Sequence, residues 1–145
     1  MGTRANPLSF TLDFTGRTVA LDAGRVWSEA RASTTAVEEG AVCRREFVLH
    51  DDGSLTEAGE IAFGDGASVT FRAEGELRSS PDPRIGHGAA ILEVTGGQGR
   101  LAGASGYITS NFLLSDDGAL EDHHLGILFL ALPADERPRR RRDRP

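Results

Sequence analysis

The chain has 145 residues with 18 glycines and 6 prolines, and its single cysteine, Cys43, excludes a disulfide within the chain. All 16 basic residues are arginines and six of them lie in the last nine positions, so residues 1–134 carry 10 arginines against 19 aspartates and glutamates. Because so acidic a body repels nucleic acids and anionic membranes, we expect neither as a partner. We also expect one cytoplasmic domain without a signal peptide or a transmembrane segment.

Apolar side chains recur at every second position through most of the chain, which is the pattern of half-buried β-strands. The first strands are expected at 10–14 and 19–21, separated by Thr15-Gly16. Pairs such as Asp52-Gly53 and Asp117-Gly118 favour tight hairpin turns, because Asp and Gly tolerate positive φ. The remaining strands are expected at 25–33, 41–50, 55–63, 69–77, 89–95, 106–114 and 120–132.

No segment shows the long apolar periodicity of a helix, so the sequence predicts an all-β fold. About eight strands with hairpin-like spacing are most simply arranged as a single closed antiparallel β-barrel, because closure removes the exposed edges of an open sheet. A barrel of this size can hold one small ligand. The barrel domain is expected over residues 1–132, and residues 133–145, rich in arginine and proline, are expected to form a disordered tail.

A glycine-rich turn connects the strands expected at 89–95 and 106–114. It reads Gly96-Gly97-Gln98-Gly99-Arg100-Leu101-Ala102-Gly103-Ala104-Ser105-Gly106. Followed by an alternating strand, it resembles a turn of the allene oxide cyclase and dirigent barrel superfamily, and within it small bacterial barrels that cyclise polyketides, including spirotetronate-forming cyclases. The resemblance implies an allene oxide cyclase-like barrel. A dinucleotide site is not expected, because those glycines would have to open a helix.

Two charged residues share strand faces with apolar residues. Glu57 alternates with Leu55 and Ile61, and a carboxylate among such neighbours loses hydration, which raises its pKa and makes it a candidate acid or base. Arg45 alternates with Phe47 on the preceding strand and is the natural partner of Glu57. The pair could position a carboxylate or enolate oxygen, or could be a purely structural ion pair.

Ser110 shares a face with Ile108 and Phe112, and the resemblance implies that this face lines the lumen. Tyr107 would then face outward, whereas a dirigent-like arrangement would turn it inward, so Tyr107 is kept as a candidate for substrate binding. Ser110 is taken as a catalytic candidate because its hydroxyl could hydrogen-bond a substrate oxygen.

Two adjacent histidines lie on the last expected strand. His123 shares a face with Leu125, Ile127 and Phe129, and it is a candidate for catalytic proton transfer. His124 must point to the opposite face, so the two cannot bind one metal ion from inside. We expect neither a metal site nor a cofactor.

Together these residues suggest an enzyme: a cofactor-free cyclase of a polyketide-type natural product, in which an apolar lumen folds a flexible substrate and a few polar groups polarise it. A lipocalin-like binding module for a small apolar molecule and a dirigent-like scaffold are the alternatives, and a homodimer or homotrimer could form through apolar outer faces. The pattern around Trp27 leaves its face open. The expected catalytic residues are Glu57, Arg45, Ser110 and His123, and the expected substrate-binding residues are Trp27, Phe47, Ile61, Phe71, Tyr107 and Phe112.

Overall fold

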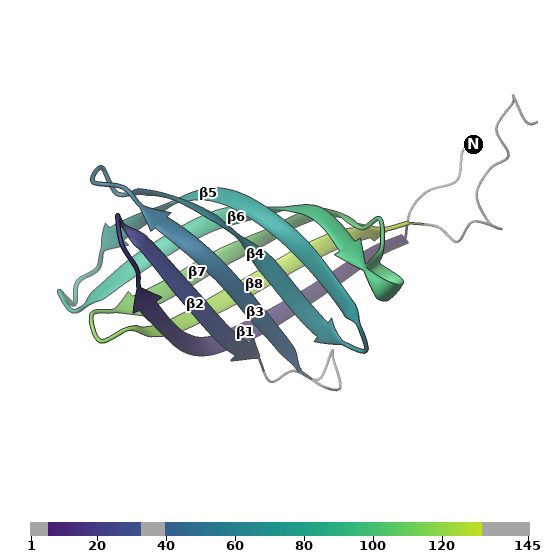
Figure 1. The fold of residues 1–145 in the computed structure, drawn as a ribbon, viewed down its shortest axis with the longest axis horizontal. Coiled ribbons are helices and arrows are strands. Elements are labelled where there is room, and N and C mark those ends of the chain that lie inside the picture. The colour runs from purple at the N-terminus through teal and green to yellow at the C-terminus, as the bar shows by residue number, and fades with distance from the viewer. Residues whose placement is uncertain (1–5, 33–39, 132–145) are drawn as a thin grey trace, which may run out of the picture.

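The computed structural model describes residues 6–32 and 40–131. Within them, eight antiparallel strands close into one barrel in which each strand pairs with its neighbours along the chain and the last pairs with the first (Figure 1). The predicted fold class is confirmed, and the expected tail at 133–145 lies outside the described residues. The elements are β1 (Asn6–Ala20), β2 (Arg25–Ala32), β3 (Ala41–Leu49), β4 (Ser54–Gly64), β5 (Ala67–Ser79), β6 (Ile85–Gln98), the 3₁₀ turn η1 (Gly99–Leu101), β7 (Ser105–Ser115) and β8 (Ala119–Leu130).

The strands expected at 10–14 and 19–21 are a single strand, β1. Its first part pairs with β8 and its second part with β2, and Figure 1 shows it curving around the barrel. Gly16 lies where the two pairings overlap, and a Cβ at this position would be 2.2 Å from the carbonyl oxygen of Glu29. The glycine therefore permits a close approach between β1 and β2 in a curved strand and does not end the strand.

The hairpin of β4 and β5 has the inside–outside alternation that the sequence predicts. Its inward apolar side chains are at most 2 % exposed at four positions, and the intervening charged side chains lie in solvent. A shift of one residue would have reversed both sets. The buried residues are Leu55, Ile61, Val69 and Phe71, and the exposed ones are Arg72, Glu74 and Glu76.

Glycines on the inner wall make room for aromatic side chains. A Cβ at Gly126 would lie 2.3 Å from the ring of Phe10, and a Cβ at Gly88 would lie 2.1 Å from the ring of Phe112. Phe10 also packs edge-on against Phe63, with 5.7 Å between the ring centroids. The rings thus fill space that small residues leave on neighbouring strands, a common way to cover glycines in curved sheets.

The outer surface carries an apolar stripe on β6, β7 and β8. Its large side chains are between 46 % and 60 % exposed, and the strand registers place them side by side, with Tyr107 opposite Ile127. The outward positions of β7 carry no charge, whereas outward arginines and glutamates are frequent on β2 to β5. The apolar stripe consists of Ile91, Tyr107, Leu125, Ile127 and Phe129. Separately, the described residues include no helix with the length and apolar character needed to cross a membrane.

Replacing Gly59 by alanine should destabilise the barrel. A Cβ there would lie 2.2 Å from the carbonyl oxygen of Arg44 and 2.7 Å from the Cα of Arg45, so the β3 backbone would have to move. Overpacking of this kind costs about 1–3 kcal/mol, which urea denaturation followed by circular dichroism would measure. Gly96→Ala is the matched control, because its Cβ would meet only the hydroxyl of Thr70 at 3.4 Å. Equal stability of the two variants would contradict this account.

The apolar stripe should hold copies of the chain together, as expected from the sequence. Large contiguous apolar patches on a protein surface commonly mark contact sites. Ile127→Glu should therefore lower the mass measured by sedimentation equilibrium toward that of one chain. Val19→Glu is the control, because Val19 is 57 % exposed on β1 away from the stripe. A wild-type protein that sediments as a monomer would contradict the expectation.

Candidate functional site

Arg45 of β3 places a guanidinium group in the barrel lumen. Its side chain is only 1 % exposed. The residue opposite it on β4 is Gly59, so no side chain competes for the space beside it. The guanidinium carbon lies 4.6 Å from the ring centroid of Phe47 and 5.7 Å from that of Phe112, within the range of cation–π attraction. Aromatic faces and a missing side chain together create a place for this cation.

Two carboxyl groups bind Arg45, one from the neighbouring strand β4 and one from β8. Its Nη1 donates to Oε1 of Glu57 on β4 at 3.1 Å, and its Nη2 donates to Oδ2 of Asp122 on β8. The two carboxylate side chains are 0 % and 1 % exposed, respectively. Three ionisable groups are therefore sealed from solvent inside an apolar barrel, and their contacts connect the β3–β4 hairpin to the last strand.

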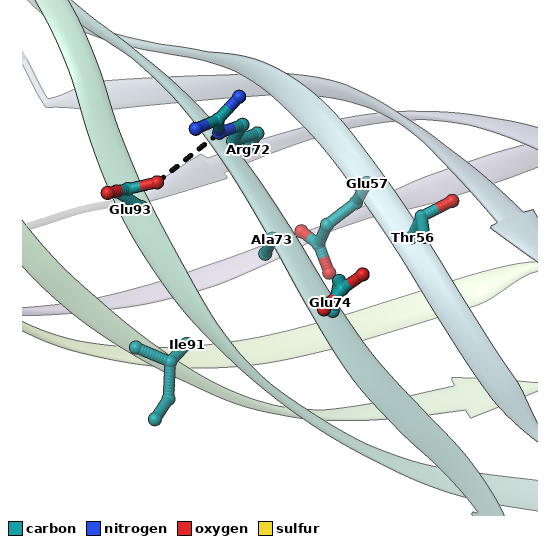
Figure 2. Close-up of a pocket in the computed structure, with 7 residues that line it drawn as sticks. All are labelled: Thr56, Glu57, Arg72, Ala73, Glu74, Ile91 and Glu93. Atoms are coloured by element: carbon teal, nitrogen blue, oxygen red, sulfur yellow. Dashed lines mark hydrogen bonds and ion pairs between the residues drawn. The ribbon is translucent and has the colours of Figure 1, made fainter.

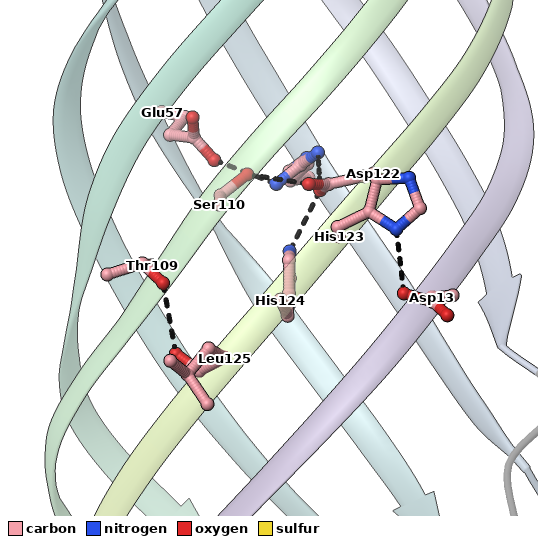
Figure 3. Close-up of polar contacts among 9 residues, drawn as sticks. Asp13, Glu57, Thr109, Ser110, Asp122, His123, His124 and Leu125 are labelled. Carbon is pink, nitrogen blue, oxygen red and sulfur yellow. Dashed lines mark hydrogen bonds and ion pairs between the residues drawn. The ribbon is translucent and has the colours of Figure 1, made fainter.

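Asp122 is also bound by Ser110 and His124 (Figure 3). The hydroxyl of Ser110 on β7 donates to its Oδ1 at 2.8 Å, and Nε2 of His124 lies 2.8 Å from its Oδ2. The imidazole of His124 packs against Phe14, with 4.8 Å between the ring centroids. We call Arg45, Glu57, Ser110, Asp122 and His124 the lumen cluster.

The two carboxyl groups of the lumen cluster differ in proton affinity. Burial alone would raise the pKa of Asp122, but Arg45 and the hydrogen bonds from His124 and Ser110 outweigh it and lower this pKa to about 2. For Glu57, burial raises the pKa, the charge of Asp122 adds to the rise, and Arg45 offsets it only in part. Burial opposes the charge of Arg45, yet Asp122 above all holds its pKa above the usual value. The cluster thus combines Asp122, which stays ionised, with Glu57, whose carboxyl group tends to keep its proton.

Four buried polar atoms of the lumen have no hydrogen-bond partner among the residues that the structure describes. Buried polar groups are nearly always paired, and leaving one unpaired costs about 1–3 kcal/mol. These atoms are therefore the unsatisfied polar groups of the lumen. They are Nε of Arg45, Oε2 of Glu57, Nδ1 of His124 and Oγ of Ser28.

The structure brings together three of the four residues expected to be catalytic. Arg45, Glu57 and Ser110 all belong to the lumen cluster, with residue exposures of 1 %, 4 % and 2 %. Four of the residues expected to bind substrate also face the lumen, and each is at most 2 % exposed. These are Phe47, Ile61, Phe71 and Phe112. Their inward positions are confirmed, and their roles stay predictions.

His123, Trp27 and Tyr107 all face solvent, so none of them lines the lumen and the expected lumen role of His123 is wrong. The outward face of Tyr107 is the one expected with Ser110 inside, and the face of Trp27, which the sequence left open, is the outer one. The His123 side chain is 51 % exposed and its Nδ1 lies 2.7 Å from Oδ1 of Asp13, a hydrogen bond that raises its pKa. Trp27 and Tyr107 are 41 % and 60 % exposed. His123 and Tyr107 have apolar neighbours because they lie beside or within the apolar stripe, and Trp27 stands opposite Val19 on an outer face.

Sequence reasoning missed Asp122 and His124. Both faces of β8 carry apolar residues, so alternation alone could not choose between them. The hairpin register offered the missing signal. Ser110 stands opposite His124, and directly opposed residues of an antiparallel pair point to the same face. With Ser110 inside, the Asp117-Gly118 turn would have placed both residues inside as well.

A groove of about 510 Å³ lies on the outer face of β4, β5 and β6. Figure 2 shows its lining side chains, in which Arg72 forms an ion pair with Glu93 at 3.2 Å. Glu57 borders this groove only through its main chain, since its side chain is 0 % exposed. The groove is therefore separate from the lumen cluster. Its remaining lining residues are Thr56, Ala73, Glu74 and Ile91.

Two further kinds of site, for a metal ion and for a reactive thiol, concern the described part of the chain. There, no group of three or more His, Cys, Asp or Glu side chains is arranged to hold a metal ion. Cys43 is buried on β3, two residues before Arg45, and burial raises the pKa of its thiol to about 12. A thiol with so high a pKa is a poor nucleophile.

Comparison with solved structures identifies the architecture. The pterocarpan synthase dirigent protein GePTS1 matches with a TM-score of 0.66 and 14 % identity, over 89 % of this chain and 91 % of its own. The chain has the fold of a dirigent protein. A second pterocarpan synthase dirigent protein, PsPTS1, matches with a TM-score of 0.66 and 12 % identity, over 90 % of this chain and 99 % of its own. No protein-family model matches the sequence, and no curated protein matches it significantly.

This dirigent fold bears out the barrel that the glycine turn implied. In the structure, that turn forms η1, and Leu101 within it is buried with 3 % exposure. Gly99 adopts a φ of 64°, and a Cβ there would lie 2.7 Å from the carbonyl oxygen of Gly66. The closer resemblance to bacterial polyketide cyclases stays a prediction.

Glu57→Gln should change how the stability of the barrel depends on pH. Because folding raises the pKa of Glu57, this group contributes stability below its unfolded pKa of about 4.3 and loses it as pH rises through the folded pKa. The variant lacks that loss, so its free energy of unfolding relative to wild type should increase as the pH rises above about 4. Urea denaturation across this range measures it. The exposed Glu74→Gln should show no such trend, and parallel curves for Glu57→Gln and wild type would contradict the assignment.

Proposed function

We propose that the chain is a cofactor-free cyclase that closes a ring in a polyketide-type substrate inside the barrel lumen, by a [4+2] or related intramolecular reaction. The observation that carries this proposal is the lumen cluster: ionisable groups sealed among apolar side chains, with polar atoms left unpaired. Groups with perturbed proton affinity and unsatisfied hydrogen bonds gather at functional sites.

The lumen walls suit the entropic part of such a reaction. A flexible chain must be folded into one reactive conformer, and a rigid apolar surface can supply that order. Phe14, Phe47, Phe71 and Phe112 are each at most 2 % exposed and come from four different strands. Aromatic rings on several sides would restrict an unsaturated chain without forming covalent bonds to it.

The polar groups suit polarisation of a carbonyl. Nε of Arg45 carries a hydrogen that no described residue accepts, so it can donate to a substrate oxygen. Glu57, whose pKa is raised, can donate through the unpaired side of its carboxyl group while it keeps its proton. In a lumen of low polarity, two such donors stabilise developing negative charge on oxygen more strongly than water does. No redox step is needed, which fits a ring closure.

The fold neighbours add support of a general kind. Two dirigent proteins of this architecture are named as pterocarpan synthases, so the same barrel serves biosynthetic enzymes elsewhere. The glycine turn adds the resemblance to bacterial cyclases that act on polyketides. Together they favour a ring-forming role on a natural product, and the glycine turn alone favours a polyketide as the substrate.

A second candidate is a barrel that binds or orients a small molecule without changing it. One observation favours it: Arg45 and Asp122 neutralise each other, Glu57 binds the same guanidinium, and all three side chains are at most 1 % exposed, as in a structural ion-pair network. Buried networks of this kind can specify a fold without taking part in chemistry. Lipocalin-like binding and dirigent-like orientation of reactants belong to this candidate.

Glu57→Gln should lower the rate of cyclisation at least about tenfold, because general acid–base help contributes about 10²–10⁴ in rate. The assay follows a linear polyketide with a conjugated diene and a second alkene, whose cyclic product has the same mass and separates by chromatography. Trp27→Ala is the control, since Trp27 faces outward and should leave the rate unchanged.

Other outcomes distinguish the candidates. Normal turnover by Glu57→Gln together with loss of turnover in Phe71→Ala would assign catalysis to the shape of the lumen. If the wild-type barrel binds the linear compound and returns it unchanged, the enzyme proposal fails and the binding candidate replaces it.

A further inference from the structure

The hydrogen bonds around Asp122 fix the proton of the neighbouring histidine. Asp122 is a carboxylate, with a pKa near 2, and can only accept hydrogen bonds. Its Oδ2 lies 2.8 Å from Nε2 of His124, so Nε2 must be the nitrogen that carries hydrogen. In the neutral imidazole, Nδ1 then bears a free lone pair.

Nothing in the described chain satisfies that lone pair. Nδ1 of His124 has no hydrogen-bond partner among the described residues, and the whole side chain is 0 % exposed. The ring cannot easily turn to find one, because Phe14 packs against it and Asp122 holds Nε2. Asp122 is itself held by Ser110 and Arg45. An oriented imidazole with a free lone pair is the arrangement of a general base.

We propose that His124, oriented by Asp122, is the general base of the lumen, and that its substrates are neutral enolisable carbonyl compounds. The inference rests on the proposed function for the place of the reaction and names the class of molecule that reacts there. No other histidine identified in the described chain combines burial with an unpaired nitrogen, since His123 is exposed and bound to Asp13.

The charges of the lumen cluster favour this substrate class. The positive charge of Arg45 and the negative charge of Asp122 cancel while Glu57 holds its proton. An anion arriving from water would have to shed its hydration in an already balanced site, which is costly. A neutral carbonyl compound avoids that cost, because its charge appears only after it is bound.

The proton transfer balances within the site. Nδ1 of His124 takes the proton from the carbon next to the carbonyl, so the C–H bond breaks and an N–H bond forms. The electron pair moves onto the carbonyl oxygen as an enolate, which accepts a hydrogen bond from Nε of Arg45. Asp122 stabilises the imidazolium, so each new charge lies beside an opposite one. The proton returns from Nδ1 to the product after the new bond has formed.

Deuterium exchange tests the base without requiring the natural substrate. Ethyl 2-methylacetoacetate has one hydrogen between its two carbonyl groups, and its loss in D₂O is followed by proton NMR. Wild type should accelerate this exchange over buffer, and His124→Gln should be at least about tenfold slower. Glutamine can still donate to Asp122 but offers no basic nitrogen. His123→Gln, the neighbouring histidine on the outer face, should exchange at the wild-type rate.

A second measurement covers the case in which His124→Gln fails to fold. Nitrogen-15 NMR of the wild-type imidazoles should show His124 as the tautomer with hydrogen on Nε2. His50→Gln, His87→Gln and His123→Gln remove the other three histidine signals one at a time and assign the fourth. Hydrogen on Nδ1, wild-type exchange at the buffer rate, or equal rates for His124→Gln and wild type would each overturn the proposal.

The same experiments separate this inference from the proposed function. Exchange that depends on His124, in a barrel that closes no ring in a linear polyketide, would leave the base in place and remove the cyclase. Ring closure that His124→Gln leaves unaffected would remove the base and leave the cyclase.

Discussion

The buried charge of Arg45 is the constraint on which the rest of the lumen depends. A guanidinium cannot shed its proton, so it remains charged wherever the fold places it. An unpaired charge in an apolar interior is so costly that the barrel must supply an anion, and Asp122 on the last strand does so. Gly59 leaves room for the side chain, and Phe47 and Phe112 present ring faces to it. Residues of four strands thus accommodate this one cation.

One carboxylate is enough to neutralise Arg45, and the lumen contains two carboxyl groups. The second, Glu57, is the one whose pKa is raised, so it adds a proton rather than a charge to the site. A buried ion pair is weak evidence for stability, since apolar residues of similar size often stabilise a core as well. The surplus carboxyl and the free nitrogen of His124 are better understood as an acid and a base kept apart by Arg45 and Asp122.

Strand alternation predicted the site where one face of a strand was polar. On β4 and β5 the outward residues are mostly charged or small, so Glu57 and Phe71 could be assigned to the lumen from sequence. On β8 both faces are apolar, because Leu125 and Ile127 belong to an exposed stripe, and the alternation chose the wrong histidine. Trp27 failed for a related reason, since a large aromatic residue was taken as a wall although it lies on the outer surface.

Which face of β8 and of β2 points inward depends on how these strands pair with their neighbours, and the pattern of a single strand does not contain that information. The glycine turn was informative because its chemistry is local: positive φ and close backbone contacts restrict which residues can stand there. The curvature of β1 was hidden for the opposite reason. Gly16 reads as a strand end in isolation, and only its contact with β2 shows that the strand continues.

The order of the strands means that the residues of the lumen cluster are synthesised at different times. Arg45 and Glu57 are 12 residues apart and meet as soon as the β3–β4 hairpin forms, but Asp122 lies 77 residues beyond Arg45. A chain still emerging from the ribosome therefore holds the arginine with only one of its two carboxyl partners. Arg45 can leave water fully only when β8 closes the barrel against β1, and such long-range closure is slow in β-proteins. Full burial of this one side chain therefore requires the closed barrel.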